Sequence, residues 1–175
     1  MLRQHGLTLV ELMVTLAVAI IVVSAGLPLF NGVVANNRAS ANANTLVRAL
    51  NLARSEAVGR GVNVTVCAAS TNPVGATPAC GSATQWTNGW FVFVDSGTVG
   101  SVDGSDVRLR IFDMPSGNKP TVSVTGTAYV TFNFMGSGGS QWTFQLDQPG
   151  ASGNVTRCVT VAQSGQIRTD RGVCP

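Results

Sequence analysis

The distribution of apolar and charged positions divides the chain into a long N-terminal helix and a segment rich in strands. From Leu12 through Asn37 there is a run of 26 residues without a charge, and its apolar density is highest from Leu12 to Val23. As a helix rising about 1.5 Å per residue, this run reaches about 39 Å, which exceeds a hydrocarbon core of about 30 Å. The pattern predicts a helix whose first half, residues 7–30, can span a membrane.

An amphipathic pattern follows over residues 31–58. Apolar residues at spacings of four, three and four form one stripe, Leu46, Leu50, Ala53 and Ala57, and the candidates for the polar face are Arg38, Arg48, Arg54 and Glu56. We expect one helix from Leu7 to about Val58, ended by Gly59 and Gly61. At about 78 Å, it must protrude from the head that it packs against.

Residues 59–175 are predicted to form a β-rich head. Runs with β-branched and aromatic residues, separated by Gly, Pro, Asn and Ser, indicate strands over Val62–Cys67, Gly89–Asp95, Val107–Phe112, Thr121–Val124, Ala128–Phe134, Trp142–Leu146 and Cys158–Ala162. The expected fold class is α+β, with the long helix laid against antiparallel sheets.

Composition narrows the class of protein. The 175 residues fit one domain with an extra element, and 45% hydrophobic with 11% charged residues excludes a disordered, collagen-like or coiled-coil chain. A formal net charge of +3 does not by itself predict binding to a polyanion. Any role with nucleic acid would have to come from local clusters of charge.

Residues for catalysis are scarce. The one histidine is His5, so removal of the first residues would leave no imidazole for a Ser-His-Asp or Cys-His arrangement or for a zinc site. The stretch Gly136-Ser137-Gly138-Gly139 lacks the lysine of a phosphate-binding loop. The sequence therefore favours a protein that is not an enzyme, with no catalytic residue, cofactor or metal.

The four cysteines contain no CxxC pair, which favours disulfides over zinc. Of three connectivities, the simplest joins Cys67 to Cys80 and Cys158 to Cys174, and four buried thiols are the alternative. Each bond would close a loop of about 15 residues, worth about 3 kcal/mol in the chain-entropy model. Disulfides place the head outside the reducing cytosol.

The N-terminus has two interpretations. Ser24 and Gly26 could precede the cleavage site of an ordinary secretory signal peptide. Against this, Glu11 places a carboxylate at the start of the apolar run, where it needs a partner. Cleavage between Gly6 and Leu7 would create an α-amino group four residues before Glu11, able to pair with it in the same helix or in a neighbouring copy.

The string Gly6-Leu7-Thr8-Leu9-Val10-Glu11 follows a short leader, residues 1–6, that contains Arg3, and precedes an apolar helix with Pro28. It resembles the class III signal of type IV prepilins and type II secretion pseudopilins, although Leu7 replaces the usual phenylalanine. The resemblance implies that a prepilin peptidase cuts after Gly6 and methylates Leu7. It also implies that Glu11 pairs with a terminal amine during filament assembly.

Segments of the head resemble the FimT and H-type minor pseudopilin subgroup. They are Leu52-Ala53-Arg54-Ser55-Glu56-Ala57, Gly61 with Val62–Cys67, Trp86 with Gly89–Asp95, and Ser164-Gly165-Gln166-Ile167-Arg168. The resemblance implies a single-pass inner-membrane protein with a periplasmic head that joins other pilins through its helix. The same helix serves type IV pili, type II secretion and DNA uptake; a plain membrane-anchored periplasmic module is a further alternative.

Arg157, Arg168 and Arg171 form a candidate DNA-binding loop. FimT-type pilins associated with DNA uptake carry Gly-Arg-x-Arg here, and this chain has Gly165 and Arg168 but Gln166 at the first arginine position. The expected binding is weak and independent of DNA sequence. The alternative is a solvated loop tied down by the second disulfide.

Two further groups of residues have both a functional and a structural interpretation. Asp95, Asp103 and Asp106 lack the spacing of an EF-hand, so we expect solvated turn carboxylates and no metal. The tryptophans at 86, 90 and 142 could stack on bases or sugars, but tryptophans in alternating strands more often fill a core.

Overall fold

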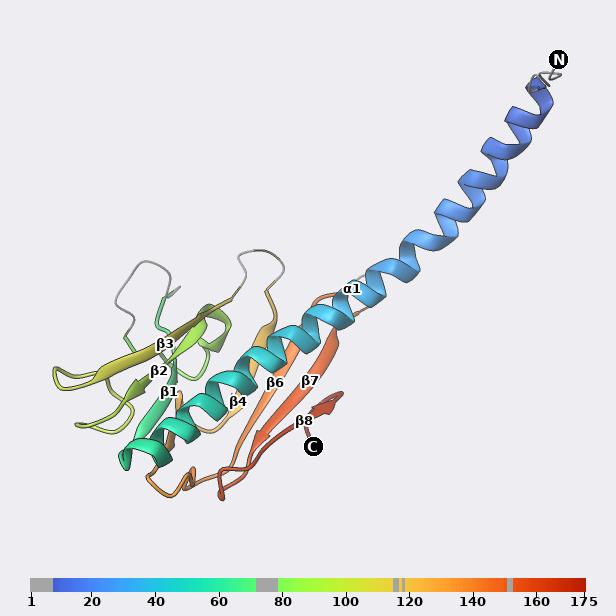
Figure 1. Ribbon diagram of the computed structural model, residues 1–175. Helices are drawn as coiled ribbons and strands as arrows, with labels where there is room; N and C mark the ends of the chain where they lie inside the picture. The colour runs from blue at the N-terminus through green and yellow to red at the C-terminus, as the bar shows by residue number, and fades with distance from the viewer. Residues whose placement is uncertain (1–7, 72–78, 115–116, 118, 151–152) are drawn as a thin grey trace, which may run out of the picture.

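One long helix lies across two antiparallel sheets, and its N-terminal half extends away from them (Figure 1). The computed structural model describes residues 8–71, 79–114, 117, 119–150 and 153–175, except for the side chains of residues 25–30. Its elements are α1 (Leu9–Arg60), β1 (Val64–Ala68), a short 3-10 helix (Trp86–Asn88), β2 (Gly89–Val94), β3 (Val107–Asp113), β4 (Thr121–Thr125), β5 (Tyr129–Phe132), β6 (Trp142–Gln148), β7 (Val155–Val161) and β8 (Ile167–Arg171). The predicted α+β class, with a protruding helix on antiparallel sheets, is confirmed.

The ends of α1 are fixed by identifiable caps. Thr8 is the N-cap, and its side-chain hydroxyl accepts a hydrogen bond from the backbone N–H of Glu11 at 3.3 Å. Gly61 adopts a left-handed conformation with φ of 70° and donates its N–H to the carbonyl of Ala57 at 2.9 Å. Of the two predicted stop signals, Gly61 ends the helix, whereas Gly59 lies within it.

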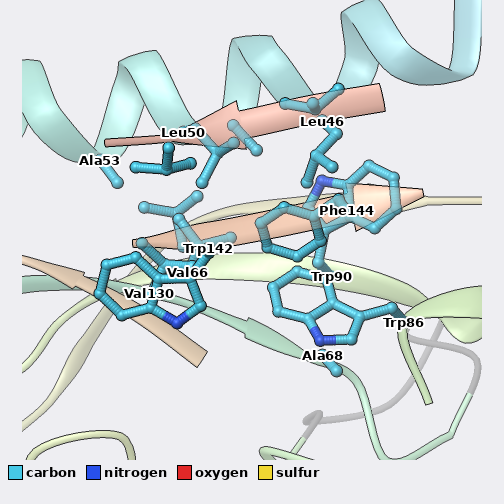
Figure 2. Close-up of a cluster of buried hydrophobic side chains, with 14 of the residues drawn as sticks. Leu46, Leu50, Ala53, Val66, Ala68, Trp86, Trp90, Val130, Trp142 and Phe144 are labelled. Atoms are coloured by element: carbon cyan, nitrogen blue, oxygen red, sulfur yellow. The ribbon is translucent and has the colours of Figure 1, made fainter. Parts of the chain in front are cut away.

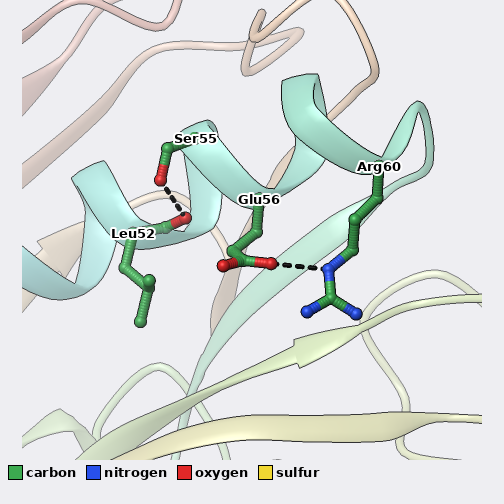
Figure 3. A network of polar contacts seen from close by, with 4 residues as sticks. All are labelled: Leu52, Ser55, Glu56 and Arg60. Atoms are coloured by element: carbon green, nitrogen blue, oxygen red, sulfur yellow. Dashed lines mark hydrogen bonds and ion pairs between the residues drawn. The ribbon is translucent and has the colours of Figure 1, made fainter.

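Two polar contacts near the end of α1 are made within the helix itself (Figure 3). Arg60 Nε donates to Glu56 Oε2 at 2.5 Å, one turn earlier on the helix, and Ser55 Oγ donates to the carbonyl of Leu52 at 2.9 Å. An exposed pair with this spacing contributes about 0.3–0.5 kcal/mol. Both contacts join residues of α1 to each other, and neither links the helix to the head.

The strands form two four-stranded sheets, in the orders β3-β2-β1-β5 and β4-β6-β7-β8, with antiparallel neighbours throughout. Each of the seven predicted strand regions overlaps one of β1 to β7, although only β2 and β5 lie entirely within the predicted bounds. The eighth strand, β8, was not predicted because Ile167 is its single apolar residue. It is an edge strand that pairs with β7, so only one of its residues needs to face the core.

The core lies between α1 and the two sheets (Figure 2). The predicted stripe of Leu46, Leu50, Ala53 and Ala57 is confirmed, since all four side chains are fully buried. The three tryptophans fill this core, as expected, and the rings of Trp86 and Phe144 pack edge to face with centroids 4.8 Å apart. The two sheets are thus joined to the helix by one continuous apolar cluster.

Both disulfides that the sequence predicts are present. Cys67 on β1 is bonded to Cys80, with Cα atoms 5.6 Å apart, and Cys158 on β7 is bonded to Cys174, with Cα atoms 5.2 Å apart. These separations lie in the usual range for disulfides. The second bond holds the segment after β8 against the sheet, where Cys174 N–H donates to Gln145 Oε1 at 3.4 Å.

Candidate filament-assembly site

The protruding half of α1 presents an apolar surface that the head does not cover. Large apolar side chains are more than half exposed at Leu9, Val10, Leu12, Met13, Val14, Leu16, Val18, Ile20, Ile21, Val22 and Val23. Burial of the helix against the head begins at Ala35, which is 5% exposed. We call the exposed segment Leu9–Val23 the free helix face. A surface of this kind requires cover from lipid or from other apolar helices.

Glu11 is the one charged residue of the free helix face. It occupies the first turn of α1 and is exposed. A carboxylate there interacts favourably with the positive end of the helix dipole. Glu11 and the apolar side chains around it combine a large apolar contact area with a single charge. Such a combination can fix the axial offset between two packed helices.

The predicted cleavage site, Gly6 and Leu7, lies outside the described residues. Within the residues that the structure describes, no helix offers a segment both long enough and apolar enough to cross a membrane. The membrane span predicted over residues 7–30 includes residue 7 and the side chains of residues 25–30, which are also outside the described part.

A polar seam joins α1 to β6 and β7 where the helix enters the head. Asn42 Nδ2 donates to Gln148 Oε1 at 2.8 Å. Arg157 is 6% exposed, and its guanidinium donates to Asn36 Oδ1, to Ser40 Oγ at 3.3 Å and to the carbonyl of Thr156 at 2.9 Å. Arg157 therefore attaches the sheet to the helix, and the prediction that it reaches DNA does not fit this position.

The other two candidate DNA-binding arginines lie on opposite faces of β8. Arg168 and Arg171 are both exposed, but they are three residues apart on a strand, where side chains alternate between faces. In the register of β7 with β8, Arg171 lies opposite Arg157. Both residues line a depression beside Ser40 and Asn44 of α1. The structure thus does not gather Arg157, Arg168 and Arg171 into one basic patch.

Asp95, Asp103 and Asp106 shape the loop between β2 and β3. Asp95 Oδ2 accepts hydrogen bonds from Thr65 Oγ1 and from the backbone N–H of Gly100. Asp106 Oδ1 accepts from the N–H of Ser96, and Asp103 Oδ2 accepts from the N–H of Thr98 at 3.0 Å. Hydrogen bonds from Thr98, first, and then from Ser105 lower the pKa of Asp103 below its ordinary value.

The expectation of solvated turn carboxylates is wrong for Asp95, which is 4% exposed, whereas Asp103 and Asp106 lie in the loop and are partly exposed. Sequence alone did not reveal this burial, because the residue directly follows β2 and its chain of hydroxyl partners, Thr65 and Thr131, comes from two other strands. In the described part of the chain, no three side chains of the metal-binding types converge.

Family models match the chain in two places. The model of the prokaryotic N-terminal methylation motif matches residues 1–27. The model of type II transport protein GspH matches residues 42–165, well over half of the chain. The chain belongs to the GspH family. Membership of this family of structural pilins and pseudopilins implies assembly with other pilin-like subunits and processing by a prepilin peptidase.

Solved structures resemble the GspH-family fold described above. The type IV minor pilin FimU of Pseudomonas aeruginosa is 22% identical over 77% of this chain and 89% of its own, with a TM-score of 0.57. A second crystal form of FimU is 21% identical over 75% of this chain and 91% of its own, with a TM-score of 0.53. No curated protein sequence matches this GspH-family chain. The structural likeness shows that the fold is that of a pilin.

Proposed function

We propose that this chain is a minor subunit of a type IV pilus or of a type II secretion pseudopilus that assembles or primes the filament. It is cleaved after Gly6, methylated on Leu7 and held in the inner membrane by residues 7–30, with residues 59–175 forming the periplasmic head. Filament assembly then transfers the helix from lipid to the apolar helices of other subunits.

The free helix face carries the proposal. The second half of α1 and the sheets of the head form one complete core, so the apolar side chains from Leu9 to Val23 are not required to complete it. Their exposure is explained if lipid covers them before assembly and other helices cover them afterwards. Energy for the transfer must come from another protein, because the sequence contains no nucleotide-binding loop.

Glu11 supplies the register. In an apolar bundle an unpaired carboxylate is destabilising by several kcal/mol. A methylated terminal amine on a neighbouring subunit would neutralise it only when the two helices are offset correctly. Assembly out of register would leave both charges without a partner.

A substitution in producing cells tests this proposal. We expect Glu11→Gln to remain in the membrane fraction with a folded head but to be lost from sheared filaments. Glu56→Gln, which removes a partly exposed carboxylate from the half of α1 that packs on the head, is the matched control and should be incorporated normally. Normal incorporation of Glu11→Gln would contradict the proposed role of this carboxylate.

A further inference from the structure

A second surface, far from the free helix face, has the features of a binding groove. It lies between α1 and the edge strand β3 and has a volume of about 570 Å³. The helix contributes Thr45, Arg48 and Leu52, and the strand contributes its last four residues, Arg110–Asp113. We call it the α1–β3 groove.

The charge of the α1–β3 groove is predominantly positive. Arg48 on the helix and Arg110 on the strand are both exposed and line it from opposite sides. Among the described residues, Asp113 is the one carboxylate in its lining and neither arginine forms an ion pair. The Arg110 guanidinium instead lies over the ring of Phe112, 5.4 Å from its centroid. Two guanidinium groups converging on one groove favour an anionic occupant.

The backbone of β3 indicates which kind of anionic ligand fits the groove. Among the described strands, β3 is the outermost of its sheet and is paired on one side only, with β2 (Figure 1). Such an edge presents main-chain N–H and carbonyl groups that an additional extended strand can pair with. The exposed side chain of Ile111, 41% exposed, offers apolar contact at the same place. An extended peptide satisfies both features better than a free phosphate does.

The same charges argue against a second β3 as the occupant. Two copies of β3 placed edge to edge would put two exposed Arg110 side chains on one pair of strands, where like charges repel. A strand with carboxylates at alternate positions would place them all on one face, where they can meet Arg48 and Arg110. Charge complementarity therefore selects an acidic strand.

We infer that the α1–β3 groove binds an extended acidic segment of an adjoining filament subunit, which adds to the edge of β3 and pairs its carboxylates with Arg48 and Arg110. This inference rests on the proposed function, since it takes the partner to be another subunit of the same filament. The groove would add a head-to-head contact to the helix packing that all subunits share.

A binding measurement on the full chain in detergent micelles tests the chemistry without the filament. The probe is the peptide (Thr-Glu)4, with (Thr-Lys)4 and a single-stranded oligothymidylate as comparisons. We expect (Thr-Glu)4 alone to bind, with affinity that falls as salt rises and with slower hydrogen exchange at the β3 amides. The double variant Arg48→Gln with Arg110→Gln should bind about tenfold more weakly or worse, whereas Arg168→Gln, on β8, should bind normally. Equal binding by both variants, or tighter binding of the oligonucleotide in the groove, would overturn the inference.

Crosslinking in producing cells tests the identity of the partner. A photo-crosslinking residue at Ile111 should capture another filament subunit through an acidic segment, and reversal of charge at Arg48 and Arg110 should abolish that product. If the chain is in sheared filaments but Ile111 captures no subunit, the groove inference fails and the proposed function stands. If the chain is absent from filaments altogether, the proposed function fails and the peptide measurement still decides the chemistry of the groove.

Discussion

The Nε atom of Arg54 donates a hydrogen bond of 3.1 Å to the backbone carbonyl of Gly136, joining α1 to the turn between β5 and β6. The same carbonyl faces the turn between β7 and β8, because a Cβ atom added at Gly165 would lie 1.9 Å from its oxygen. Helix and both turns therefore meet at one peptide group. This contact gives Gly165 a structural role that does not depend on binding to any ligand.

Replacing Gly165 tests this contact. Gly165 has φ of 80°, and Gly139 has φ of 77° with no atom near its missing Cβ, so the two share the backbone strain but not the clash. A left-handed non-glycine residue costs about 1–3 kcal/mol. We expect Gly139→Ala to show that loss alone and Gly165→Ala to be clearly less stable, measured by denaturant unfolding with tryptophan fluorescence as the readout. Equal losses would mean that the backbone contact at Gly136 contributes nothing.

Arg157 is predicted to act on stability. Arg157→Ala removes a buried guanidinium and leaves Asn36 Oδ1 and the Thr156 carbonyl without their donor at a partly buried seam, which should destabilise the protein by about 1–3 kcal/mol. Arg168→Ala, at an exposed edge, should change the unfolding free energy by less than about 0.5 kcal/mol.

The same two substitutions separate stability from DNA binding. If the three arginines formed a phosphate-binding cluster, each substitution would lower the salt dependence of DNA retention by about one counterion. We expect no such common effect, because Arg157 is buried and the other two lie on opposite faces of β8. Equal reductions in salt dependence for both variants would restore the DNA-binding interpretation.

Acid should loosen the loop between β2 and β3. The hydrogen bond from the backbone of Thr98, followed by those from Ser105, lowers the pKa of Asp103 relative to the unfolded chain, where the pKa of aspartate is about 3.9. The stabilisation is therefore present above that pH and is lost as the pH falls through the lower folded-state pKa. Amide NMR shifts of Thr98 should follow a transition below about pH 3.9 that is absent in Asp103→Asn. A transition centred above that value would contradict the direction of the pKa shift.

Local periodicity was sufficient to predict much of the fold. The stripe from Leu46 to Ala57 is spaced so that one helix face must be buried, and alternating β-branched residues marked seven strand regions. Cysteine spacing was also informative, because both bonds close short loops between neighbouring parts of the chain. In each case the decisive interactions lie close together in the sequence or repeat with a simple period.

The sequence was less informative where a residue's role depends on its register in a sheet. Arg157, Arg168 and Arg171 are near one another in the chain, but pairing of β7 with β8 buries the first and separates the other two. Asp95 resembles a turn residue until its partners on neighbouring strands are known. The α1–β3 groove likewise joins segments about 60 residues apart in the chain, Arg48 to Arg110. No periodic signal connects them.

The intact mass of the chain recovered from sheared filaments tests the central claim most directly. The account predicts a polypeptide that begins at Leu7, carries one added methyl group on its terminal amine and retains both disulfides. A mature chain that begins after Gly26 would identify an ordinary signal peptide, remove Glu11 and the free helix face from the mature protein, and contradict the account.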